Sequence, residues 1–141
     1  MTTDDDRRRV SIDRTSNSHY TVTNARGGTI GVGDGSDAAF TPVELLLTAI
    51  GGCTAIDVDL LTSRRAEPDS FGVEVGAAKV RDGQGNHLRD IEVTFTIRFP
   101  EGEAGDAARA ILPDVVKLSH ERLCTVSRTV EIGTPVTARI A

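Results

Sequence analysis

The strongest constraint on the fold of this chain is a nearly uninterrupted apolar run, VELLLTAIGGCTAIDVDLL, at residues 43–61. Thr41 and Pro42 precede it and Glu44 follows the threonine by three residues, which is a capping box with a proline at the first helical position. The pattern predicts a helix that begins here and runs to about Arg64–Arg65, where two cations favour the negative end of the helix dipole. Apolar side chains lie all round this helix, so we expect it to be covered on several sides.

One face of this predicted helix carries little side-chain volume, because Ala49, Gly52, Cys53 and Ile56 share it by helical spacing. Glycine in a helix interior costs about 1 kcal/mol relative to alanine, so two glycines in succession indicate the close approach of another backbone or of a ligand. Tight helix packing and a reactive thiol beside the thin face both remain open. Because a chain of 141 residues has little mass to cover such a helix, we expect a homodimer with the site at or near its interface.

Alternating apolar and polar residues predict strands in most of the remaining chain. They fall at residues 8–13, 19–24 and, more weakly, 28–33, in a long hairpin around Asp82–Gly85, and at 127–140. Residues 104–123 are helical again, and Pro113 predicts a kink or a break into two helices, with Cys124 at the end of the segment. This order predicts an α+β fold with antiparallel sheet, formed as a single domain over residues 1–141.

Composition excludes several classes of function. A formal net charge of −5 and an aromatic content of 4% argue against a nucleic-acid partner. The N-terminus has no apolar signal-peptide core, and Asp57 and Asp59 interrupt the longest apolar run, so we expect a cytoplasmic protein with no membrane partner. Two cysteines, Cys53 and Cys124, are too few for a disulfide scaffold, and no Cys/His cluster indicates a metal.

Two segments carry a family resemblance. TPVELLLTAIGGCTAIDV resembles the central-helix motif of the OsmC-like proteins, the family that includes the organic hydroperoxide resistance proteins, and LSHERLCTVSRTV resembles their second cysteine motif. The resemblance implies an OsmC-like α+β fold, with antiparallel sheets around the long central helices of an intertwined homodimer. It also implies a peroxidase of oxidative-stress defence, in which Cys53 attacks an organic hydroperoxide, Cys124 resolves it as a disulfide, and a dithiol reductant recycles the pair without a bound cofactor.

Peroxide chemistry requires a Cys53 thiolate, which a nearby cation would favour. The peroxidase branches hold an arginine near the thiol with a glutamate directly after the helix-start proline, where this chain has Val43. Glu44 lies one residue later, rotated by about 100° along the helix, and the capping box already accounts for it. Arg26 is the candidate cation, although most arginines lie at the solvated surface and this interpretation is favoured for it. Asp57 would raise the pKa of the Cys53 thiol unless an arginine pairs with it.

His120 lies one turn before Cys124 and is a candidate base or metal ligand, or an exposed side chain at a helix end. Because the segment before Cys124 is helical, we expect the negative end of a helix dipole to disfavour a thiolate there. Three functions follow: a thiol peroxidase, a redox-sensitive binding protein for a small hydrophobic ligand, or a structural dimer module whose cysteines only fill the core.

Overall fold

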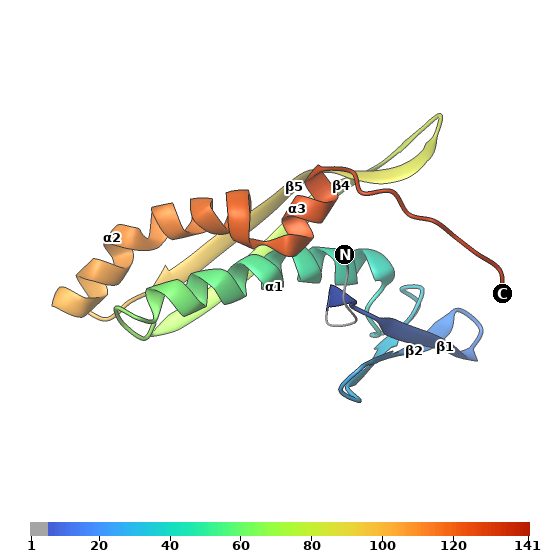
Figure 1. Cartoon of the computed structure of the whole chain (residues 1–141), viewed down its shortest axis with the longest axis horizontal. Coiled ribbons are helices and arrows are strands. Elements are labelled where there is room, and N and C mark those ends of the chain that lie inside the picture. Colours follow the sequence, from blue (N-terminus) through green and yellow to red (C-terminus); the bar gives the residue numbers. More distant parts are fainter. Residues whose placement is uncertain (1–5) are drawn as a thin grey trace. The chain divides into compact units, whose positions relative to one another are not determined.

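The structure, a computed structural model, describes residues 6–141, which form two compact units that divide between Leu46 and Leu47 (Figure 1). The first unit contains a small sheet and the start of the long helix. The second contains the rest of that helix, a long hairpin and the C-terminal helices. The single domain expected over residues 1–141 stays a prediction.

The sheet of the first unit is antiparallel, in the order β1-β2-β3. Its strands are β1 (Val10–Ser16), β2 (His19–Asn24) and β3 (Thr29–Val32). The two later strands are confirmed as predicted, whereas the first begins two residues later than expected and runs on to Ser16, with an irregularity between Arg14 and Ser16. The short turn after Ser16 reverses the chain, so that β2 pairs antiparallel with β1.

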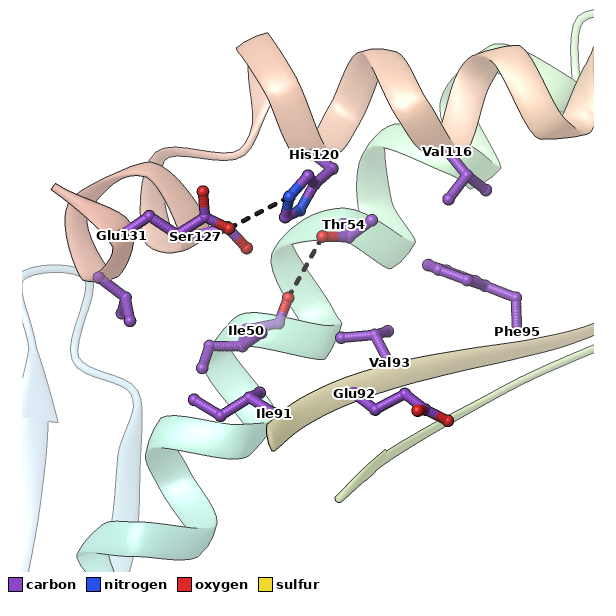
Figure 2. A pocket seen from close by; sticks show the side chains of 11 residues that line it. Ile50, Thr54, Ile91, Glu92, Val93, Phe95, Val116, His120, Ser127 and Glu131 are labelled. Atoms are coloured by element: carbon purple, nitrogen blue, oxygen red, sulfur yellow. Dashed lines mark hydrogen bonds and ion pairs between the residues drawn. The ribbon is translucent and has the colours of Figure 1, made fainter. Parts of the chain in front are cut away.

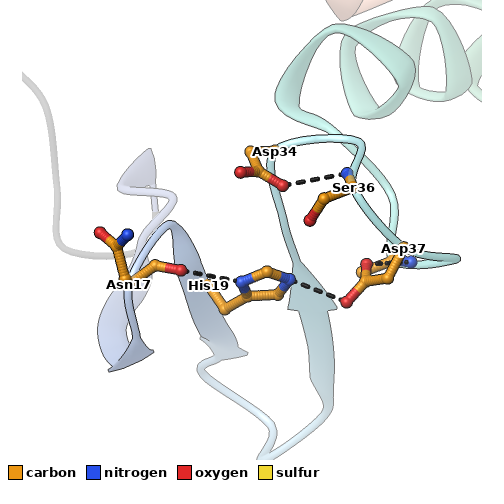
Figure 3. Close-up of polar contacts among 6 residues, drawn as sticks. Asn17, His19, Asp34, Ser36 and Asp37 are labelled. Carbon is orange, nitrogen blue, oxygen red and sulfur yellow. Dashed lines mark hydrogen bonds and ion pairs between the residues drawn. The ribbon is translucent and has the colours of Figure 1, made fainter.

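His19, at the start of β2, holds the loop that follows β3 (Figure 3). Its Nδ1 donates to the carbonyl oxygen of Asn17 at 3.0 Å, and its Nε2 donates to Asp37 Oδ2 at 2.8 Å. Both partners are acceptors, so only the doubly protonated ring satisfies both, and the Asn17 carbonyl and then Asp37 raise the pKa of His19. The Ala39 N–H and then His19 lower the pKa of Asp37.

Helix α1 (Pro42–Thr62) begins where the capping box predicted. The Thr41 N–H donates to Glu44 Oε1 at 2.9 Å, and the Glu44 N–H donates to Thr41 Oγ1 at 3.2 Å. These reciprocal bonds satisfy two backbone donors at the helix start. Hydrogen bonds from the Thr41 backbone and then from its side chain lower the pKa of the Glu44 carboxyl. The local sequence therefore determines the position at which α1 starts.

By length and composition alone, α1 is apolar enough to cross a membrane, as are the core helices of many soluble proteins. Only 28% of its most apolar window is buried within the chain. Ile56 and Leu60, for example, are 65% and 58% exposed. The coverage expected on several sides is therefore incomplete in a single chain.

The predicted hairpin is confirmed as β4 (Ser70–Asp82) and β5 (Gly85–Arg98), paired antiparallel as far as Asp82 and Gly85. Its half-buried apolar residues alternate with exposed ones, and they pair across the strands as Phe71 with Ile97, Val73 with Phe95 and Val75 with Val93. One face of the hairpin is therefore apolar over this stretch, up to a register shift between Gly76 and Ala78.

Gly51 places α1 against this apolar face. A Cβ added at Gly51 would lie 2.4 Å from Val75 Cγ2, which is closer than van der Waals contact allows. Among residues 6–141, a Cβ added at Gly52 would meet nothing within 4 Å. The predicted close approach is confirmed at Gly51, where the neighbour is β4 of the same chain, whereas Gly52 lies on a face that this chain leaves open.

The second helical region differs from the sequence prediction. Helix α2 (Glu103–Leu118) continues through Pro113, and the change comes later, at a π-helical turn, η2 (Ser119–Leu123). A proline removes one backbone hydrogen bond, which the other bonds of a 16-residue helix tolerate here. The π turn is closed by a bond from the Cys124 N–H to the Ser119 carbonyl oxygen at 2.8 Å.

The strand predicted at residues 127–140 is wrong. Residues Thr125–Glu131 form helix α3, because Cys124 caps a new helical turn by accepting the Ser127 N–H. Residues 134–141 have no regular secondary structure, and no described strand pairs with them. Val136 and Ile140 are 95% and 99% exposed, so the alternating pattern has no sheet edge to join in this chain.

Replacement of Gly51 by alanine tests the packing of α1 on β4. We expect Gly51→Ala to lower the free energy of unfolding by about 1–3 kcal/mol, because the new methyl group overlaps Val75. Gly52→Ala is the matched control and gains up to about 1 kcal/mol of helix propensity in the chain. Urea denaturation measures both, and a Gly51→Ala protein as stable as Gly52→Ala would contradict this packing.

The ring pKa of His19 tests the loop contact. NMR titration should place it above the ordinary value of about 6.5, and Asp37→Asn should bring it down. Because the folded-state pKa is raised, the stabilisation is full below pH of about 6.5 and is lost as the pH rises through the folded pKa. His19→Gln should remove this part of the pH dependence, and a pKa at or below the ordinary value would refute the assignment.

Candidate functional site

The two cysteines lie together in the second unit. Cys53 lies on α1, and Cys124 lies at the junction of η2 and α3. Both are free thiols, and they lie close enough together for each to shift the pKa of the other. The structure thus brings together the two residues that the sequence analysis placed at the site.

Cys124 has several polar partners although its side chain is only 1% exposed. The Ser127 N–H donates to Cys124 Sγ at 3.3 Å, and the thiol lies 3.3 Å from Ser127 Oγ. The Thr54 hydroxyl, which donates to the Ile50 carbonyl oxygen at 3.4 Å, lies close enough to lower the pKa of this thiol as well. Burial alone would raise the pKa of Cys124, but the bonds from Ser127, Cys53 and Thr54 outweigh burial and lower the pKa.

This environment corrects the expectation that a helix C-terminus disfavours a thiolate at Cys124. The residue caps the N-terminus of α3, where the Ser127 N–H donates to the sulfur. The segment before it is helical as predicted, but the chain turns into a second helix directly after it. The sulfur therefore lies at the N-terminal end of α3 as well as after the preceding helical segment.

At Cys53, the influences that raise the thiol pKa outweigh those that lower it. Burial, the hydrogen bond with Cys124 and the charge of Asp57 raise the pKa of the Cys53 thiol, against one bond from the Val126 N–H that lowers it. No arginine or lysine of residues 6–141 is among the principal influences on either thiol. The pKa values of the two thiols are therefore shifted in opposite directions, upward at Cys53 and downward at Cys124.

The supporting candidates from the sequence divide between the two units. Asp57 accepts a hydrogen bond from the fully buried Ser119 Oγ at 2.8 Å and acts on Cys53 through its charge, without the arginine partner that was considered. Glu44 forms the capping box, and Arg26 is exposed in the turn between β2 and β3. Both belong to the first unit, whereas the thiols belong to the second.

A pocket of about 330 Å³ lies next to the hydroxyl groups that contact Cys124 (Figure 2). Its wall is mainly apolar and comes from α1, β5, α2, η2 and α3: Ile50, Thr54, Ile91, Glu92, Val93, Phe95, Val116, His120, Ser127, Val130 and Glu131. His120 Nε2 lies 3.1 Å from Glu131 Oε1, so the predicted site histidine pairs with a carboxylate of α3. The volume is at the low end of the range for small-molecule sites.

Thr54 and Ser127 were missed by sequence reasoning, although both contact Cys124 and line the pocket. A signal for Ser127 was present, because a capping residue bonds the N–H three positions later and Ser127 follows Cys124 by three. Thr54 had no such local signal, since its partner lies far along the chain. No group of three or more potential metal ligands occurs within residues 6–141.

Known proteins resemble this chain over most of its length. A family model described as OsmC-like protein matches residues 33–139. An uncharacterized protein of Mycobacterium tuberculosis is 32% identical over 131 residues, which cover 92% of this chain and 93% of the relative.

Solved structures share the fold. An OsmC-like protein of unknown function from Vibrio cholerae matches with a TM-score of 0.73 at 12% identity, covering 89% of this chain and 94% of the other. The organic hydroperoxide resistance protein OhrB of Bacillus subtilis matches with a TM-score of 0.55 at 16% identity, covering 88% and 90%. The predicted fold class, mixed helix and antiparallel sheet of OsmC-like type, is confirmed, and the chain belongs to the family of OsmC-like proteins.

Proposed function

We propose that this protein is a thiol-dependent peroxidase that reduces organic hydroperoxides through Cys53 and Cys124. The observation that carries the proposal is the proximity of two free thiols from segments far apart in the sequence, each of which shifts the pKa of the other. The adjoining apolar pocket and the name of the Bacillus subtilis neighbour also support it.

The proposed reaction has two steps. Cys53 Sγ attacks the distal peroxide oxygen as the O–O bond breaks, which gives a sulfenic acid at Cys53 and an alcohol. Cys124 Sγ then attacks the Cys53 sulfur and releases water, so the dithiol is oxidised to a disulfide while the peroxide is reduced. A dithiol reductant of the solution restores both thiols.

The surroundings of the two sulfurs support this division of roles. Cys53 is half-buried, whereas Cys124 is 1% exposed, so an incoming peroxide reaches Cys53 first. The raised pKa of Cys53 requires a base, and we assign this role to the thiolate form of the adjacent Cys124, which its lowered pKa favours. The proton passes from Cys53 to Cys124 and on to the departing alkoxide, which leaves Cys124 as the thiolate that resolves the sulfenic acid.

A stoichiometric titration with cumene hydroperoxide tests the proposal. The unmodified protein should turn over with a dithiol, and Cys53→Ser should abolish the reaction. Cys124→Ser should be slower, consume about one equivalent and stop as a sulfenic acid at Cys53, as measured by mass spectrometry. Oxidation that persists in Cys53→Ser, or no peroxide consumption by the unmodified protein, would show that the peroxidase proposal is wrong.

The pocket favours a second candidate function, a redox-sensitive binding protein for a small hydrophobic ligand. Its apolar wall shares Thr54 and Ser127 with the surroundings of Cys124, so a bound ligand would change the environment of that thiol. Ligand binding without peroxide consumption in the titration above would favour this function.

We also propose that the protein acts as a homodimer. The face of α1 that carries Gly52, Ile56 and Leu60 is apolar and uncovered in the single chain. Burial of such a face against a second copy would remove apolar surface from water, which is the main favourable term in association. Cys53 borders this face, which would bring the site close to the interface.

A charged substitution on this face tests the dimer. The unmodified protein should sediment at twice the chain mass of 15.0 kDa, and Ile56→Lys should shift it toward the monomer because a buried, unpaired charge opposes association. Leu118→Lys, at a comparably apolar exposed position on α2, is the control and should remain dimeric. A monomeric unmodified protein at micromolar concentration would refute the dimer.

A further inference from the structure

The two sulfurs of the pair differ in how well each would carry a negative charge on leaving a disulfide. Cys124 Sγ accepts from the Ser127 N–H at 3.3 Å and lies 3.3 Å from the Ser127 hydroxyl oxygen. The Thr54 hydroxyl, which donates to the Ile50 carbonyl oxygen, is near enough to lower the pKa of Cys124. Cys53 has one backbone donor, from Val126, and it lies near the carboxylate of Asp57. Both Ser127 groups belong to α3, so they remain in place whichever thiol is oxidised.

We propose, resting on the disulfide of the proposed function, that the dithiol reductant attacks Cys53 Sγ and that Ser127 and Thr54 position Cys124 as the leaving thiolate. A new bond forms between the reductant sulfur and Cys53 Sγ, the Cys53–Cys124 bond breaks, and its electron pair goes to Cys124 Sγ. The second thiol of the reductant then attacks the mixed disulfide, which frees Cys53 and leaves the reductant as an oxidised disulfide.

The chemistry of thiol exchange favours this direction. Attack occurs faster at the sulfur whose partner leaves as the more stable thiolate, and access decides between sulfurs that are otherwise equal. Both factors agree here, because Cys124 has the hydrogen-bond donors and is also the more buried sulfur. On leaving, the Cys124 thiolate accepts from the Ser127 hydroxyl, which rotates from acceptor to donor.

The experiment traps the first adduct without using peroxide. The unmodified protein, in its native assembly, is oxidised with diamide, treated briefly with glutathione, quenched with N-ethylmaleimide and mapped by peptide mass spectrometry. We expect glutathione on Cys53 and maleimide on Cys124 in at least about tenfold excess over the reverse pattern. Glutathione mainly on Cys124, an even split, or no disulfide with diamide would overturn the proposal.

Variants of Ser127 separate positioning from general structure. Ser127→Ala should lower the excess of the Cys53 adduct several-fold and shift the pH profile of Cys124 alkylation to higher pH, and Ser127→Thr should restore both. Thr54→Val should act in the same direction and replaces Ser127→Ala if that variant does not fold. Ser63→Ala is the matched control, because the Ser63 hydroxyl bonds Asp59 on the last turn of α1.

An unchanged adduct ratio and alkylation profile in both Ser127→Ala and Thr54→Val would refute the positioning role. The outcome is independent of the peroxidase proposal, because diamide supplies the disulfide. If the protein does not consume hydroperoxide, the experiment still shows which sulfur glutathione attacks. The peroxidase proposal and the proposal on the direction of attack can therefore be refuted independently.

Discussion

The close contact between α1 and the β4–β5 hairpin at Gly51 determines the position of the residues around the site. No side chain separates the helix from Val75, so the next residues of the helix, Cys53 and Thr54, are held at a fixed height above the sheet. A larger residue would lift the helix or displace the strand, and the pocket between α1 and β5 would change with it. The glycine pair thus has two separate roles: Gly51 packs against the same chain, and Gly52 lies on an open face.

Burial is the largest single influence on the pKa of each thiol, and hydrogen bonds determine how the two pKa values differ. Both sulfurs are desolvated, and desolvation alone raises the pKa of each. Donors from Ser127 and Thr54 reverse this effect at Cys124, whereas the Asp57 charge adds to it at Cys53. Two chemically identical side chains in contact therefore acquire different acidities, which is what a relay between an attacking and a resolving thiol requires.

The sequence predicted those parts of the fold that depend on neighbouring residues. The capping box of Thr41 and Glu44 located the start of α1, and the turn at Asp82–Gly85 located the hairpin. It misassigned residues 127–140, because an alternating segment becomes a strand only where a sheet edge is available, and the helical turn at Cys124 formed instead.

The site was only partly predictable for the same reason. Both cysteines were identified from their motifs, but their relative acidity was not, because Thr54 contacts Cys124 from a distant part of the chain. The Asp57 charge was anticipated from its helical spacing to Cys53, whereas its bond to Ser119 joins two helices that no local pattern relates. Long-range partners thus determine the properties of residues that local motifs identify.

The π-helical turn at Ser119–Leu123 allows a five-residue spacing on one segment to face a four-residue spacing on α1. Asp57 and Cys53 lie four residues apart on α1, and they contact Ser119 and Cys124, which lie five residues apart across the turn. In an ordinary α-helix, Leu123 would occupy the place of Cys124 on that face. The proximity of Cys124 to Cys53 therefore depends on the number of residues in this turn as well as on the presence of the two cysteines. In an evolutionary series, the gain or loss of one residue here would connect or disconnect the cysteine pair without any substitution of a cysteine.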